Sequence, residues 1–203
     1  MIKDRIIFRE FKEAEIDTRE VLRYAGVRGN DESFLPLLFE CQKELSAHIR
    51  GLSAYRIVDF FTDGNISYIG NLPLESKKLA EAMAGSEYAV IFAATLGIGV
   101  DRAIAKQQRI STSRAHMMSS IANERIESLC DELCRALEEE LAEEGYSLTP
   151  RFSAGYGDLD ISYQKDIFKL LSPEKYIGLT LSESCLMSPA KSVSAIIGLR
   201  KRK

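Results

Sequence analysis

The residues best suited to bind a small molecule lie in one short segment, residues 150–160, which we name the Arg151 loop. Arg151 offers a planar guanidinium that can hold a carboxylate through two parallel hydrogen bonds. Gly155 lets a ligand approach the backbone closely, and the adjacent Tyr156 ring could stack on a purine or lie against a sulfonium cation. The Ser153 hydroxyl and the local N–H groups could bind polar atoms. The loop therefore suits a small zwitterion with an aromatic part.

The same residues also fit a turn that binds nothing. Short glycine-containing segments are common in proteins. In such a turn Arg151 would be a surface residue and Tyr156 a half-buried one. The loop alone leaves both interpretations open.

A second block of residues follows the loop in the chain. It reads Leu181-Ser182-Glu183-Ser184-x-x-Met187-x-Pro189-x-x-Ser192-Val193-Ser194. Together with Arg151-x-x-x-Gly155-Tyr156, and in the same order, this block resembles the C-terminal activation domain of vitamin B12-dependent methionine synthase. The resemblance extends over residues 150–198. At one place the sequence departs from the family, because Ile196 and Ile197 stand where the family has an aromatic pair whose Tyr lies close to the ligand.

The resemblance implies that the chain binds S-adenosylmethionine and supports the reductive remethylation of cob(II)alamin. Arg151 would hold the methionyl carboxylate, Gly155 and Ser153 would receive the ligand against the backbone, and Tyr156 would stack on it or cap it. Asp17 aligns with an acidic residue that contacts the ligand in the family, although it could equally be only a helix N-cap. The methyl group would pass from a sulfonium to cobalt, so no general base and no catalytic residue are expected. The chain would contribute by positioning.

The implied partner is a cobalamin-dependent methionine synthase that lacks its own activation domain, with flavodoxin or a similar protein as electron donor. The chain ends at Lys203 and resembles a stand-alone form. Neither histidine lies in the Asp-x-His-x-x-Gly pattern of corrinoid-binding domains, so the cobalamin is expected on the partner. Two other functions stay open: sensing of S-adenosylmethionine without methyl transfer, and a structural subunit that binds no small molecule.

Composition is that of an ordinary globular protein, with 203 residues, 45% hydrophobic and 28% charged. It suits a single unit, residues 1–203, or a helical and hairpin lobe, 1–110, packed on a ligand-binding lobe, 111–203. The net charge of −3 gives no general attraction to nucleic acid. No apolar stretch approaches the ~20 residues that span a bilayer, and the N-terminus lacks a signal-peptide core. We therefore expect a cytoplasmic protein without membrane contact. The four cysteines lack metal-site spacing and are expected to be reduced core residues.

Hydrophobic periodicity and turn residues predict a mixture of helices and strands. Helices are predicted at 19–24, 31–50, 76–83, 113–144 and 163–171, and strands at 6–8, 55–61, 66–69, 88–95, 177–181 and 192–197. The last two strands are predicted to pair with each other, and Gly51 to close the 31–50 helix. A lone Gly-x-Gly at 97–99 is interpreted as a turn before a helix rather than a dinucleotide fingerprint. Without a regular βαβ rhythm the pattern indicates an α+β fold. The family's twisted antiparallel sheet flanked by helices is compatible with it.

Overall fold

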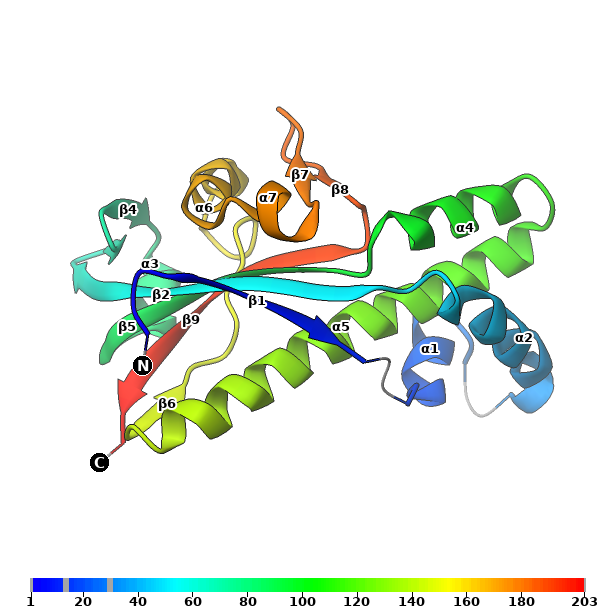
Figure 1. Cartoon of the computed structure of the whole chain (residues 1–203), viewed down its shortest axis with the longest axis horizontal. Coiled ribbons are helices and arrows are strands. Elements are labelled where there is room, and N and C mark those ends of the chain that lie inside the picture. The colour runs from blue at the N-terminus through cyan, green and yellow to red at the C-terminus, as the bar shows by residue number, and fades with distance from the viewer. Residues whose placement is uncertain (1, 13–14, 29–30, 203) are drawn as a thin grey trace.

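The computed structural model describes residues 2–12, 15–28 and 31–202 and is built around one twisted antiparallel sheet (Figure 1). Its strands are β1 (Ile6–Phe11), β2 (Gly51–Asp63), β3 (Ile66–Ile69), β4 (Leu72–Glu75), β5 (Ser86–Thr95), β6 (Tyr146–Leu148) and β9 (Ser192–Lys201). They are arranged in the order β4-β3-β2-β5-β9-β6, and β1 pairs with the first part of β2. Strand β9, near the end of the chain, therefore lies between β5 and β6.

Helices cover both faces of this sheet. The helices are α1 (Thr18–Tyr24), α2 (Leu35–Ser46), α3 (Lys77–Ala82), α4 (Ile98–Gln108), α5 (Thr112–Ala142), α6 (Gln164–Leu171) and α7 (Pro173–Ile177). Short 3-10 turns, η1 (Glu32–Phe34) and η2 (Ile161–Tyr163), precede α2 and α6, and a small hairpin joins β7 (Thr180–Leu181) to β8 (Met187–Ser188). The long helix α5 crosses one face, whereas α6, α7 and the β7–β8 hairpin lie on the other (Figure 1).

The core is divided into two layers because the central strands are buried on both faces. Side chains alternate along a strand, so Val90 and Phe92 of β5 pack toward α5 while Ile91 packs toward α6. In β9 the same alternation sends Ile197 to the α5 layer and Ile196 to the α6 layer, both 0% exposed. The family's aromatic positions are thus occupied here by two core residues on opposite faces of the sheet.

Helix α5 is the longest element and supports most of the loops discussed below. The Ser111 side chain accepts a hydrogen bond from the Arg114 N–H at its start, and Gly145, with φ +82°, lies just past its end. At 1.5 Å per residue, its 31 residues span about 46 Å. An apolar stripe of buried residues, including Leu133 and Leu137, holds it against the sheet.

The α+β fold with a helix-flanked antiparallel sheet is confirmed, but three local predictions were wrong. The strand predicted at 177–181 is reduced to Thr180–Leu181, because α7 extends to Ile177 and Gly178 ends that helix. Gly51 does not close a helix; α2 ends at Ser46 and Gly51 begins β2, because the Arg50 N–H bonds to Leu96 O at 2.9 Å and draws the chain into the sheet. The two C-terminal strands do not pair with each other either. Strand β7 pairs with β8, whereas β9 is buried on both faces and takes both its neighbours, β5 and β6, from the central sheet. Within the described ranges, no helix combines the length and apolarity that a membrane span requires.

Candidate functional site

The Arg151 loop follows the edge of β9 before it turns away toward α6. The backbone of Phe152 exchanges two hydrogen bonds with Ile196, at 2.9 and 2.8 Å. The Ser153 hydroxyl then donates to Ser194 O at 2.8 Å. Because the chain is extended here, Arg151 and Phe152 point to opposite faces of the sheet.

Arg151 points to the α5 face, where two carboxylates hold its guanidinium. Its Nη2 atom donates to Glu127 Oε2 at 3.0 Å and to Asp131 Oδ1 at 2.9 Å. The Arg151 side chain is 26% exposed, so it is neither a free surface arm nor a buried residue. Arg151 is therefore a partly exposed residue that is ion-paired within the protein, which both interpretations of the loop allow. Both ion pairs use one nitrogen of a group that carries five N–H donors.

The electrostatic surroundings keep this guanidinium charged. Burial works against its charge, but the neighbouring Cys130, Glu127 and Asp131 raise the pKa of Arg151. Cys130 shows the opposite balance, because burial raises the pKa of its thiol to about 12 although Arg151 lowers it. Cys130 is therefore a protonated core thiol next to the loop, not a reactive thiolate.

The next part of the loop turns sharply at Gly155, whose φ is +88°. A side chain there would be strained at this φ, and its Cβ would lie 2.9 Å from the flexible Ile161 Cδ1, so the backbone conformation favours a glycine whether or not a ligand binds. Tyr156 is 67% exposed, and its ring meets Phe152 edge-on, with centroids 5.4 Å apart. Since Phe152 belongs to the α6 layer of the core, Tyr156 and Arg151 lie on opposite sides of the sheet edge. A ligand that touches both has to lie across this edge.

Asp158 anchors the end of the loop to α3, a role that the sequence analysis missed. Its carboxylate accepts a short hydrogen bond from the Ser76 hydroxyl and one from the Lys77 N–H at 3.0 Å. The Ser76 hydroxyl in turn accepts from the Leu79 N–H and caps the helix. These bonds lower the pKa of Asp158, the Ser76 bond most of all. Because Ser76 and Asp158 are 82 positions apart in the chain, the pair carries no local sequence signal.

Asp17 caps α1, as one of its two interpretations predicted. Its carboxylate accepts from the Arg19 N–H at 2.9 Å and the Glu20 N–H at 3.2 Å. Its own backbone N–H donates to Glu124 Oε1 of α5 at 3.3 Å. Glu124 and Arg125 form a buried ion pair at 2.6 Å, with side chains 3% and 4% exposed. Asp17 is thus fixed to α5 at a buried charged pair.

Asp17 and Arg151 are therefore attached to neighbouring positions of one helix. Glu124 contacts the Asp17 backbone, and Glu127 and Asp131 contact Arg151. The structure places no direct contact between Asp17 and the described side chains of the Arg151 loop. The spacing i, i+3, i+7 of these three acidic residues puts them along one side of α5. That spacing is readable in the sequence and could have drawn attention to them.

The second family block is also fastened to α5. Lys191 donates from Nζ to Asn123 Oδ1 at 2.7 Å and to the Ser119 hydroxyl at 2.9 Å. Burial lowers the pKa of Lys191, and Asp101 partly offsets this. Asp101 itself accepts from the Ala190 N–H at 2.7 Å. The segment that leads into β9 is held in place from both α4 and α5.

The fold and this loop arrangement define a class of protein: an antiparallel α+β domain with a glycine-containing loop along the sheet edge, fastened to one long helix. A solved structure, the crystal structure of the MetH reactivation domain bound to AdoHcy, has the same fold, with a TM-score of 0.71 at 18% identity. That alignment covers 97% of this chain and 78% of the other. No curated protein matches this chain.

The family follows from the sequence match. The model of the vitamin B12 dependent methionine synthase activation domain matches residues 77–202, more than half of the chain. The chain therefore belongs to the vitamin B12-dependent methionine synthase activation domain family. The matched range contains the Arg151 loop and Lys191, whereas Asp17 lies outside it.

Proposed function

We propose that this protein binds S-adenosylmethionine at the Arg151 loop and supports the reductive remethylation of cob(II)alamin carried by another protein. Membership of the activation domain family supports a role in methionine synthase reactivation. The partner would be a cobalamin-dependent methionine synthase without its own activation domain, and the electron donor flavodoxin or a similar protein. Free cysteines suit a reducing compartment, for which we propose the cytoplasm. Strand β9 pairs with β5, which comes from the N-terminal half of the chain, so we propose that residues 1–203 act as one unit.

The observation that carries this proposal is the attachment of Asp17 and Arg151 to the same part of α5. Glu124 and Asp131 are seven residues apart, which is about 10 Å along a helix. A single small ligand can span that distance. This common attachment to α5 supports assigning Asp17 and Arg151 to one site.

In this site the chain would act by binding and orienting. The Arg151 guanidinium, held at Nη2 by two carboxylates, has further N–H donors for the carboxylate of the ligand. Glu127 and Asp131 would favour the cationic sulfonium and ammonium groups. Tyr156, exposed at the sheet edge, offers a ring face to the adenine.

Methyl transfer would require no further chemical role of this chain. The sulfonium leaves as a neutral thioether, so no side chain has to move a proton, and accurate positioning is the contribution expected from the protein. When bound to the partner, cobalamin would supply the cobalt nucleophile. Ser153, bonded to Ser194 O, would hold the loop backbone at a fixed distance from β9.

Calorimetric titration with S-adenosylmethionine, followed by a methylation assay, tests the proposal. We expect saturable binding, and methylcobalamin should form when a cob(II)alamin-loaded methionine synthase and a reductant are added. Binding without methylcobalamin would indicate a sensor. No binding at all would contradict the proposal and favour a structural subunit.

A further inference from the structure

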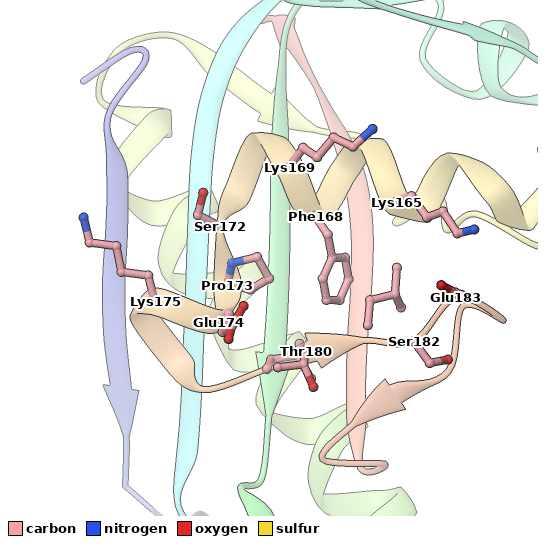
Figure 2. Close-up of a pocket in the computed structure, with 12 residues that line it drawn as sticks. Lys165, Phe168, Lys169, Ser172, Pro173, Glu174, Lys175, Thr180, Ser182 and Glu183 are labelled. Atoms are coloured by element: carbon pink, nitrogen blue, oxygen red, sulfur yellow. The ribbon is translucent and has the colours of Figure 1, made fainter.

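A cavity lies on the sheet face opposite α5, between α6, α7 and β7 (Figure 2). Its volume is about 980 Å³, at the upper end of the range for small-molecule sites, roughly 300–1,000 Å³. The proposed S-adenosylmethionine site does not use it.

The inner surface of the cavity is apolar. Phe168, Pro173 and Leu179 line it and are buried in the protein, and Leu181 is partly buried beside them. Figure 2 shows the Phe168 ring pointing into the space between α6 and β7. Small-molecule sites typically combine such a lining with a few polar groups that fix orientation.

Two opposite charges lie at the open end of the cavity. Lys165 of α6 and Glu183, which follows β7, are both exposed there and approach from different elements (Figure 2). The nearby Lys169 already pairs with Asp166 at 2.8 Å. Within the described part of the chain, neither Lys165 nor Glu183 forms an ion pair within 4.0 Å. Lys165 and Glu183 therefore offer a ligand one cation and one anion from two elements, while Glu174 and Lys175 of α7 also line the cavity (Figure 2).

The cavity is separate from the Arg151 loop. Arg151 is bound to α5 on the other face of the sheet. The end of the loop is bound to α3, where Asp158 accepts from the Lys77 N–H and the Lys78 side chain lies over Gly157. The cavity is bounded instead by α6, α7 and β7. A ligand in it would not contact Arg151.

We propose that this cavity binds an α-amino acid with an apolar side chain, or a ligand of the same zwitterionic chemistry. Lys165 would pair with the carboxylate and Glu183 with the ammonium group, while the side chain enters the apolar space over Phe168. Of this pair, a simple anion would use only Lys165, and a simple cation only Glu183. The opposed charges favour a molecule that carries both.

Three probes with the same ring separate these cases: L-phenylalanine, phenethylamine and 3-phenylpropionate. Each is titrated into the ¹⁵N-labelled full chain while amide shifts are followed. We expect shifts confined to α6, α7 and β7, and L-phenylalanine should bind about fivefold more tightly than either singly charged probe. Shifts elsewhere, or equal affinities for all three probes, would overturn the proposal.

Substitutions at two exposed positions test the role of each charge and should not disturb the fold. Lys165→Gln should weaken L-phenylalanine and 3-phenylpropionate about fivefold and leave phenethylamine unchanged. Glu183→Gln should weaken L-phenylalanine and phenethylamine and leave 3-phenylpropionate unchanged. Lys106→Gln in α4 and Glu139→Gln in α5 are matched controls and should change nothing. If Lys165→Gln and Glu183→Gln also change nothing, the charges do not recognise the ligand.

The test is independent of the S-adenosylmethionine proposal. Arg151→Ala should leave L-phenylalanine binding intact whether or not S-adenosylmethionine binds to the wild type. Saturating S-adenosylmethionine should not displace the probe. Displacement would show that the two ligands share one site and would contradict a separate cavity.

Discussion

The Arg151 guanidinium lies 2.9 Å from Asp131 Oδ1, and this ion pair links the candidate ligand loop to the long helix α5. The second carboxylate, Glu127, is 3.0 Å from the same nitrogen. A side chain held in this way is oriented before a ligand arrives, which lowers the entropy cost of binding. Arg151 thus has a structural role that is compatible with a binding role, and the two have to be measured separately.

At Asp17, a structural role and a binding role can be measured separately by substitution. Asn is as good an N-cap as Asp, so Asp17→Asn should leave the free energy of unfolding nearly unchanged, whereas Asp17→Ala should lower it by about 1 kcal/mol. If the carboxylate contacts the ligand, Asp17→Asn should still weaken S-adenosylmethionine binding. Urea melts and calorimetry on both variants measure these effects. Unchanged affinity in Asp17→Asn would reduce this residue to a helix cap.

Asp158 should make the stability of the loop anchor depend on pH. Its pKa in the folded protein is below the ordinary value of 3.8, so its contribution is fully present above pH 3.8 and is lost as pH falls through the lower folded value. Asp158→Asn should therefore be less stable than wild type at pH 7, and the difference should shrink below about pH 4. Glu139→Gln, an exposed change on α5, is the control. A difference that stays constant with pH would contradict the assigned anchor.

Ile197 should behave as a core residue and not as a ligand contact. It is 0% exposed and packs in the α5 layer, so Ile197→Ala should lower the free energy of unfolding by about 2–5 kcal/mol, and Ile197→Val by about 0.5–1.5 kcal/mol. Affinity for S-adenosylmethionine, measured where each variant is folded, should not change. Intact stability together with lost binding would show that this position contacts the ligand after all.

Much of the fold was predictable because the strongest local signals agree with the tertiary structure. The predicted helix at 113–144 is α5, with Gly145 just beyond its end, and the strands at 66–69 and 88–95 were found. The pairing of β9 was not predictable, since a strand buried on both faces shows no alternation that marks its neighbours. The residues of β9 predict a strand, but its partner strands are distant in the sequence and could not be predicted.

The candidate site was also predictable only in part. Glycine permits the positive φ found at Gly155, and the N-cap role of Asp17 was one of two interpretations. The ion pairs of Arg151 with α5, and of Glu124 with Arg125, were not predicted. They depend on how a helix and a distant loop pack together. Family resemblance located the loop, but only the structure shows that Arg151 and Tyr156 face opposite sides of the sheet edge.

The most direct test of the central claim is a calorimetric comparison of wild type, Arg151→Ala and Arg151→Lys with S-adenosylmethionine. Loss of a partly desolvated charge pair costs on the order of 2 to 5 kcal/mol, so Arg151→Ala should weaken binding by more than about thirtyfold. Arg151→Lys should also bind poorly, because an ammonium group lacks the planar fork. Folding stability should fall by no more than about 1 kcal/mol in either variant. Arg135→Ala, which removes an exposed cation of α5, should leave affinity unchanged. Wild-type affinity in a folded Arg151→Ala protein would contradict the assignment of this loop as the S-adenosylmethionine site.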